Sequence, residues 1–109
     1  MSNIGNVLDR LMTTVESRRG DDPETSYTAS LLAKGPARCA KKFGEEAVEV
    51  ALAGALQDAP ELVNESADVL YHLAVLLAAN GVSFADVAAA LAAREGTSGH
   101  EEKAGRKTS

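Results

Sequence analysis

Two clusters of acidic residues stand out in this sequence, because their spacing would place several carboxylates on neighbouring helical turns. The stretch KKFGEEAVEV contains Glu45, Glu46 and Glu49, and NESADVLYHL contains Glu65 and Asp68. At about 100 degrees per residue, the three glutamates fall within one arc of a helix. Like charges at helical spacing repel one another. Such a cluster therefore requires either free exposure to water or a cation.

A hairpin of two helices would bring the two acidic clusters face to face. Glu46 and Glu49 are three residues apart, about one helical turn, and Glu65 and Asp68 repeat this spacing on the next predicted helix. In an antiparallel hairpin, four carboxylates can converge from facing helices, as in the metal sites of helical bundles. Oxygen-only ligands suit hard cations, so the predicted metal is Mg2+, or alternatively Mn2+, rather than zinc.

The alternative is that these acids are solvated surface charges, as most charged runs are. Two observations favour the metal site: the acids share helix faces with expected core residues, and none of the four has a lysine four residues later, which is the favourable pairing. The expected core residues on those faces are Ala53, Leu56, Val75 and Leu76. Lys41 and Lys42 precede Glu45 and Glu46 by four residues, so a structural ion pair stays an alternative there.

Basic side chains gather where the third predicted helix begins. They are Lys34, Arg38, Lys41 and Lys42. Cations near a helix N-terminus oppose the macrodipole, so this placement is unfavourable unless an anion joins them. A phosphate group would gain from both the basic side chains and the free backbone N–H groups, which predicts phosphate binding. Ordinary solvated side chains are the alternative for any single one of them.

Other polar residues carry weaker signals. Tyr27 and Thr28 are candidates for substrate contact, although capping and packing explain them nearly as well. His72 lies one turn beyond Asp68 and could orient a ligand, but a lone histidine on an apolar helix is interpreted as a core residue. Cys39 is interpreted as a packed small side chain. No serine or cysteine occupies a recognisable nucleophile motif, which favours direct attack by water over a covalent intermediate.

The elements that must position these residues are all predicted to be helices. A first amphipathic helix is indicated by apolar residues at three- and four-residue steps, namely Ile4, Val7, Leu8, Leu11, Met12 and Val15. Gly20 and Pro23 in RRGDDPE break it. Ser26 is expected to cap a short helix through TASLLAK, which ends at Gly35.

Three further helices follow. They are predicted from Pro36 to about Gln57, from about Pro60 to about Asn80, and from about Ser83 to about Arg94. Proline suits the first turn of a helix, because its missing N–H has no partner there in any case. Gly81 ends the fourth helix. Ser83 and Asp86 have the spacing of a capping box at the start of the fifth.

One all-α domain is therefore expected, a small antiparallel bundle of about five helices over residues 1–95. The remaining stretch, residues 96–109, has almost no apolar side chains and is predicted to be a mobile tail. The fourth helix is apolar around nearly its whole circumference, which is typical of a helix buried on all sides. A chain of 109 residues has too few helices to surround it, so the bundle is expected to be completed by homodimerisation.

Composition excludes several classes of protein. The formal charge of -5 and the lack of an extended basic block argue against a nucleic-acid partner. The single cysteine excludes an intrachain disulfide and fits a reducing compartment. The N-terminus lacks the apolar core of a signal peptide. The run VLYHLAVLLAA is shorter than the roughly 20 residues of a membrane span. A soluble, cytoplasmic protein without a membrane partner is expected.

The acidic signature resembles that of a known group of enzymes. GEEAVE and ESAD fit the pattern EExxE followed by ExxD of the all-alpha nucleoside triphosphate pyrophosphohydrolases. Within this group, SYTASLLAKG, KKFGEEAVEV, ADVLYHLAVLL and GTSGHEEK resemble segments of the phosphoribosyl-ATP pyrophosphatase family. The likeness covers most of the chain.

This resemblance implies hydrolysis of 1-(5-phosphoribosyl)-ATP to 1-(5-phosphoribosyl)-AMP and pyrophosphate, the second step of histidine biosynthesis. It implies that Glu46, Glu49, Glu65 and Asp68 bind the metal, with Glu45 as the candidate for orienting water or acting as general base. Two alternatives stay open: a housekeeping pyrophosphatase for non-canonical nucleoside triphosphates, and a non-catalytic helical interaction domain.

Overall fold

The chain folds into five helices, and the predicted all-α class is confirmed. A computed structural model describes residues 2–96, and no strand occurs in that range. The helices are α1 (Ile4–Ser17), α2 (Tyr27–Lys34), α3 (Pro36–Ala55), α4 (Ala59–Ala79) and α5 (Phe84–Ala93). Of the predicted tail, residues 96–109, all but Gly96 lies outside the described residues.

Local signals in the sequence place most of the helix ends. The Ser26 side chain accepts a hydrogen bond from the Ala29 N–H, so it caps α2 as predicted. Gly35 has a φ of 93°, a conformation that glycine adopts without steric cost, and Pro36 then starts α3. At the start of α5, both hydrogen bonds of the Ser83–Asp86 capping box are present.

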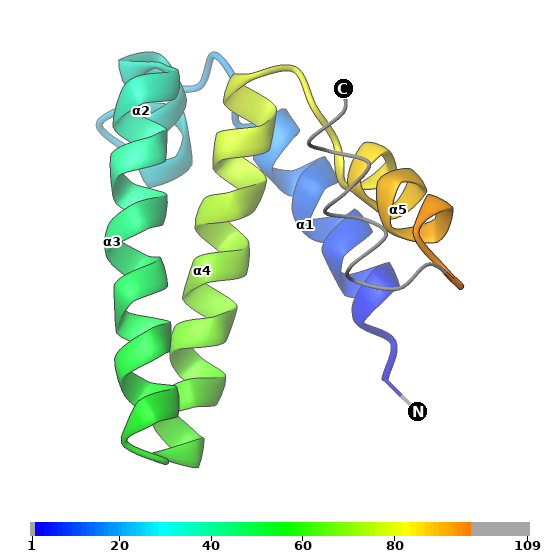
Figure 1. Ribbon diagram of the computed structural model, residues 1–109. Coiled ribbons are helices and arrows are strands. Elements are labelled where there is room, and N and C mark those ends of the chain that lie inside the picture. Colours follow the sequence, from blue (N-terminus) through cyan, green and yellow to red (C-terminus); the bar gives the residue numbers. More distant parts are fainter. Residues whose placement is uncertain (1, 97–109) are drawn as a thin grey trace.

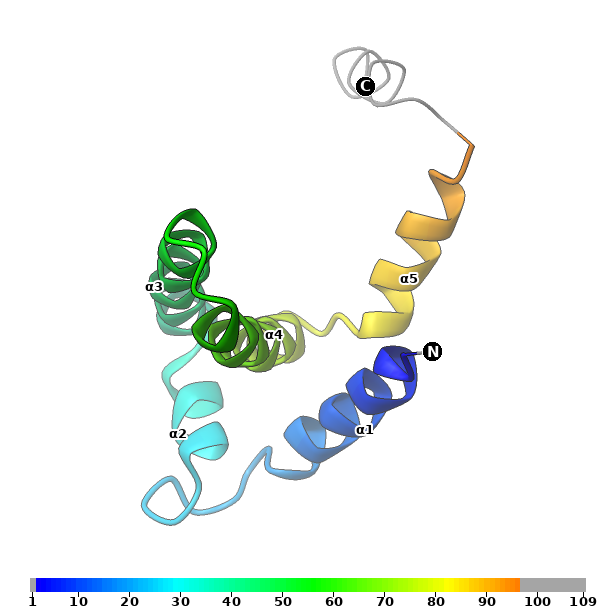
Figure 2. The same ribbon diagram turned by 90° about the horizontal axis from the view of Figure 1, so that it is seen from below.

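Helices α3 and α4 form an antiparallel hairpin that runs the full height of the molecule (Figure 1). Viewed along the hairpin, α4 lies between α3 and α1, while α5 packs against α1 (Figure 2). The Arg19 guanidinium donates a 2.7 Å hydrogen bond to the Ala78 carbonyl at the C-terminal end of α4. This contact ties the segment after α1 to the last turn of α4, where the Ala78 carbonyl also accepts a hydrogen bond from the Gly81 N–H.

The buried core occupies only one end of this hairpin. It is made by Met12, Val15, Leu31, Cys39, Ala74, Val75, Ala78 and Phe84. These residues come from the N-terminal part of α3, the C-terminal half of α4, and the helices that cover them. The opposite end, which carries the α3–α4 turn, extends beyond the other helices (Figure 1). We refer to it as the free end of the hairpin.

Exposed apolar residues mark the free end. They are Val48, Leu52 and Leu56 on α3 and Val63 on α4, which together we call the free-end stripe. The expectation that Leu56 belongs to the core of the single chain is wrong, because its side chain is 79% exposed. Ala53 and Val75 are buried as expected. The difference arises because α3 and α4 cover only one face of each other at this end, and no third helix packs beside them.

Helix α4 is long and apolar enough to cross a membrane, with a mean hydropathy of 1.3, but only 22% of that stretch is buried within the chain. The run VLYHLAVLLAA alone is too short to span a membrane, but α4 as a whole, with 21 residues, is long enough. The core helix of a soluble protein has the same length and composition. Glu65 and Asp68 lie within it, and ionised side chains are costly in a bilayer. These two acidic residues therefore argue against interpreting α4 as a membrane span.

Candidate metal and phosphate site

Three of the predicted acidic residues come together at the middle of the hairpin. Glu46 on α3 and Glu65 and Asp68 on α4 each offer a carboxylate oxygen, and these oxygens lie within 4.8 Å of one another. The three-residue spacing places Glu65 and Asp68 on one face of α4, and the antiparallel pairing brings Glu46 opposite them. We call these residues the acidic triad. It stands at the boundary between the covered end of the hairpin and the free end.

Glu49 and Glu45 lie outside this triad, and both are exposed. On an ideal helix Glu49 is rotated about 60 degrees from Glu46, toward the face that carries Val48 and Leu52. Glu49 thus borders both the triad and the free-end stripe. Lys42 forms a 3.5 Å salt bridge with Glu45, three residues later. The two pairings at a spacing of four residues, Lys41 with Glu45 and Lys42 with Glu46, do not occur among residues 2–96.

Glu61 is a neighbour of the triad that sequence reasoning missed. It lies four residues before Glu65, in the first turn of α4, where the helix dipole stabilises a negative charge. A hydrogen bond to the Glu61 carboxyl, followed by partial burial and by the charges of Glu61, Asp68 and Glu46, raises the pKa of Glu65 to about 7. The four-residue spacing was the available signal.

None of the predicted metal ligands has a salt-bridge partner within residues 2–96. The charges of Asp68 and Glu46 contribute to the raised pKa of Glu65, which indicates that the carboxylates of the triad repel one another. A divalent cation bound among them would offset this repulsion. The donor set consists of oxygens only, which fits Mg2+ or Mn2+ and suits zinc poorly. The residues present therefore fit a hard divalent ion.

Replacing Glu65 with glutamine is expected to change how stability depends on pH in the metal-free protein. The folded-state pKa of Glu65, about 7, lies above its ordinary value of 4.5, so the folded protein binds more protons than the unfolded chain between these values. The free energy of unfolding therefore falls as pH rises through this window. When the pH is raised from 4.5 to 7 in the presence of EDTA, the melting temperature of Glu65→Gln should fall less than that of the unmodified protein.

The exposed loop residue Glu24 gives the control for this experiment. Glu24→Gln should follow the pH dependence of the unmodified protein, because Glu24 makes no contact with the triad. If Glu65→Gln lost as much stability as the unmodified protein between pH 4.5 and pH 7, the crowding assigned to Glu65 would be refuted.

One helical turn beyond Asp68 on α4, His72 and the aromatic ring of Tyr71 lie next to the triad. His72 is buried, and its ring meets the Tyr71 ring edge-on at 5.0 Å between centroids. Burial lowers the pKa of His72, and the positive charge of Lys42 lowers it further. The negative charges of Glu46 and Asp68 act in the opposite direction and raise this pKa, but the net shift is downward. The imidazole is thus neutral at pH 7, as expected for a core histidine. The Thr28 and Tyr71 hydroxyls share a hydrogen bond, so Thr28 has a packing role here.

The predicted phosphate-binding residues lie at the covered end of the hairpin. Lys34 is in the last turn of α2, and Arg38 is in the first turn of α3. Both are exposed, as is Lys41. Lys42 is the most enclosed of the four, with a side chain that is 27% exposed. Three of these cations thus remain accessible to an anion, and the fourth is paired with Glu45.

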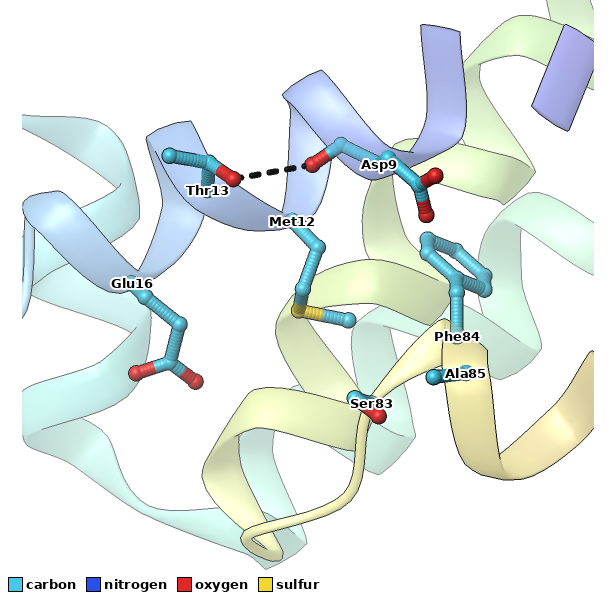
Figure 3. Close-up of a pocket in the computed structure, with 7 residues that line it drawn as sticks. All are labelled: Asp9, Met12, Thr13, Glu16, Ser83, Phe84 and Ala85. Atoms are coloured by element: carbon cyan, nitrogen blue, oxygen red, sulfur yellow. Dashed lines mark hydrogen bonds between the residues drawn. The ribbon is translucent and has the colours of Figure 1, made fainter. Parts of the chain in front are cut away.

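A cavity of about 470 Å³ lies in a different place, between α1 and the start of α5 (Figure 3). Met12 and Phe84 give it an apolar floor, and Asp9 and Glu16 stand at its edge. It contains none of the residues predicted from the sequence to bind metal or substrate. The chemistry indicated by the acids therefore belongs to the open face of the hairpin and not to this cavity.

Comparison with known proteins identifies the family. The family described as Phosphoribosyl-ATP pyrophosphohydrolase matches residues 8–95. A protein named Phosphoribosyl-ATP pyrophosphatase from Cereibacter sphaeroides is 61% identical over 100 residues, covering 92% of this chain and 97% of that protein. Proteins of the same name from Rhodobacter capsulatus, 60% identical over 91% of this chain and 96% of theirs, and from Paracoccus denitrificans, 57% identical over 92% and 93%, are similar as well. The chain belongs to the phosphoribosyl-ATP pyrophosphohydrolase family.

Proposed function

We propose that this chain hydrolyses 1-(5-phosphoribosyl)-ATP to 1-(5-phosphoribosyl)-AMP and pyrophosphate, the second step of histidine biosynthesis. Family membership makes it a hydrolase that acts on a phosphoric anhydride. The observation that carries the proposal beyond the family is the acidic triad on the open face of the α3–α4 hairpin. An accessible carboxylate cluster beside basic side chains suits a polyphosphate bound through a cation.

We assign Mg2+, with Mn2+ as a substitute, to the carboxylates of Glu46, Glu65, Asp68 and Glu49. The first three are already close together, and Glu49 adjoins Glu46 on the same helix. A divalent ion bound there would neutralise phosphate charge and lower the pKa of a bound water molecule. The role of the chain is to hold four oxygens at this point and to leave one side open for the substrate.

The remaining predicted residues act on the substrate and on water. Lys34, Arg38, Lys41 and Lys42 are proposed to contact phosphate groups, with Thr28 nearby at the start of α2. Glu45 is proposed to orient the attacking water or to accept its proton, and its salt bridge to Lys42 would hold the carboxylate in position. These roles need only hydrogen bonds and charge, which is typical of phosphoryl transfer.

Direct attack by water is supported by the state of the single cysteine. Cys39 is buried, and its Sγ donates a hydrogen bond to the Leu31 carbonyl. Burial raises the pKa of the Cys39 thiol, so it is protonated at neutral pH and a poor nucleophile. Cys39 is thus a packed core residue and takes no part in the reaction.

We further propose that a second copy of the chain covers the free-end stripe, giving a two-fold symmetric dimer. Three exposed apolar residues, Val48, Leu52 and Leu56, lie four residues apart and so share one face of α3, and α4 beside it is only partly covered. A patch of this kind can pair with itself about a two-fold axis. Glu45 and Glu49 share the same face of α3, so the second copy would also border the metal site. We assign the enzyme to the cytoplasm as a soluble protein.

Pyrophosphate release from phosphoribosyl-ATP by the full-length protein tests the proposed function. Turnover is expected with Mg2+, is expected to disappear when EDTA removes the ion, and is expected to return with added Mg2+ or Mn2+. Ordinary and modified nucleoside triphosphates should be cleaved far more slowly. Equal rates on modified triphosphates would instead indicate a housekeeping pyrophosphatase, and lack of any hydrolysis would indicate an interaction domain.

A further inference from the structure

Tyr27 presents an aromatic ring to solvent next to His72, which lies one helical turn from the triad residue Asp68. The chain has two tyrosines, two phenylalanines and no tryptophan, so aromatic rings are scarce. Phe84 is buried, Phe43 and Tyr71 are partly buried, and Tyr27 alone of the four is exposed, at 55%. Tyr27 is therefore the aromatic side chain with the most surface open to a ligand among residues 2–96.

The Tyr27 ring is held in position by two neighbouring rings. It stacks against Tyr71 with 6.4 Å between centroids and an angle of 20° between planes. His72 meets it edge-on at 6.2 Å and 87°. Both arrangements are favourable for aromatic side chains. The ring is therefore supported from within the chain while much of its surface stays accessible.

The Tyr27 side chain is not needed for the cap of α2 or for the hydrogen bond between α2 and α4. The N-terminus of α2 is capped by the side chain of Ser26, and the hydroxyl pair that links α2 to α4 belongs to Thr28 and Tyr71. Within residues 2–96, the Tyr27 hydroxyl takes part in no hydrogen bond. Neither the helix cap nor the α2–α4 contact requires an exposed aromatic ring at this residue.

The ring lies where the next part of a bound nucleotide would be. His72, its neighbour, is one turn from Asp68 along α4, a rise of about 6 Å. The imidazole is also close enough to Glu46 and Asp68 for their charges to influence it. A polyphosphate held at the triad through a cation would thus place its ribose and base within reach of this aromatic surface.

We propose that Tyr27 is the stacking platform for the purine base of the substrate, with Tyr71 and His72 positioning its ring. This inference rests on the proposed function and adds a specificity-determining residue to it. Stacking of a base on an aromatic side chain is favourable for any base and is worth about 1–3 kcal/mol by alanine substitution. The metal and the basic residues would hold the phosphates, while Tyr27 would distinguish a nucleotide from a bare polyphosphate.

Steady-state kinetics with Mg2+ and phosphoribosyl-ATP provide the first test. Tyr27→Ala and Tyr27→Leu should lower kcat/KM about 5- to 150-fold, mainly through KM, because the base loses its partner. Tyr27→Phe keeps the ring and should stay within about twofold of the unmodified enzyme. Leu91→Ala, which truncates a 60%-exposed side chain on α5, is the matched control and should have no effect.

A binding measurement separates base recognition from a structural role. By calorimetry with Mg2+, Tyr27→Ala should weaken binding of α,β-methylene-ATP about 5- to 150-fold and leave inorganic tripolyphosphate unchanged. Equal weakening of both ligands, or no weakening of either, would overturn the assignment. So would a Tyr27→Phe variant as impaired as Tyr27→Ala. If the unmodified protein failed to cleave phosphoribosyl-ATP, the proposed function would fall, while the analogue titration would still decide the role of Tyr27.

Discussion

Replacing Asp68 with asparagine is expected to lower kcat/KM for phosphoribosyl-ATP by more than about 100-fold. Loss of a residue that merely supports a metal ligand already costs about 10- to 100-fold, so loss of a direct ligand should exceed that range. Asparagine has nearly the same shape as aspartate but lacks the negative charge that attracts the ion. The Mg2+ concentration needed for half-maximal activity should rise in parallel, which a titration of activity against Mg2+ measures.

The same substitution elsewhere provides the control. Asp9→Asn on α1 changes the same residue type on an exposed surface and should leave activity unaltered. Glu46→Gln should behave like Asp68→Asn, because both carboxylates belong to the acidic triad. Glu49→Gln should lower kcat/KM less than these two substitutions, since Glu49 lies at the border of the cluster. Full activity of Asp68→Asn at low Mg2+ would refute the ligand assignment, provided that circular dichroism shows intact helices.

Replacing Leu52 with lysine is expected to convert the proposed dimer into monomers. Leu52 is 52% exposed in the single chain and lies near the middle of the free-end stripe. A two-fold interface contains each residue twice, so the substitution removes two buried leucines at once. At about 1.5 kcal/mol or more for each, the dissociation constant should rise more than about 100-fold. Sedimentation velocity over a range of concentrations would show the shift.

Leu91→Lys is the matched control for this experiment. It places the same charge at an exposed leucine of α5, away from the free-end stripe, and should leave the association state unchanged. A Leu52→Lys protein that sediments as a dimer would exclude the stripe from the interface. An unmodified protein that is monomeric at all concentrations would refute the dimer itself.

Helix ends could be predicted from the sequence because they depend on neighbours only a few residues apart. The Ser26 cap, the positive φ of Gly35 and the Ser83–Asp86 box each involve groups within about one turn. Their geometry is decided before any helix packs against another. The capping of α4 is equally local, because the Asp58 side chain accepts a hydrogen bond from the Glu61 N–H three residues later.

The candidate site was predicted only in part, because its composition depends on how two helices face each other. The three-residue spacing of Glu65 and Asp68 was sufficient to place both on one face of α4. The sequence could not decide whether Glu46 or Glu49 points toward that face, since either choice satisfies the helical period. Packing of α3 on α4 brings Glu46 to the triad and turns Glu49 toward the stripe.

The sequence by itself determined an all-α chain, the ends of its helices and the acidic residue types that select a hard cation, because capping, periodicity and donor chemistry are properties of short segments. Only the tertiary structure decided that Glu46 joins Glu65 and Asp68, that Tyr71 and His72 support the Tyr27 ring, and that Leu56 stays exposed at the free end. These relations join residues through the rotation and register of packed helices. That rotation follows from the interlocking of many side chains, which no short segment contains.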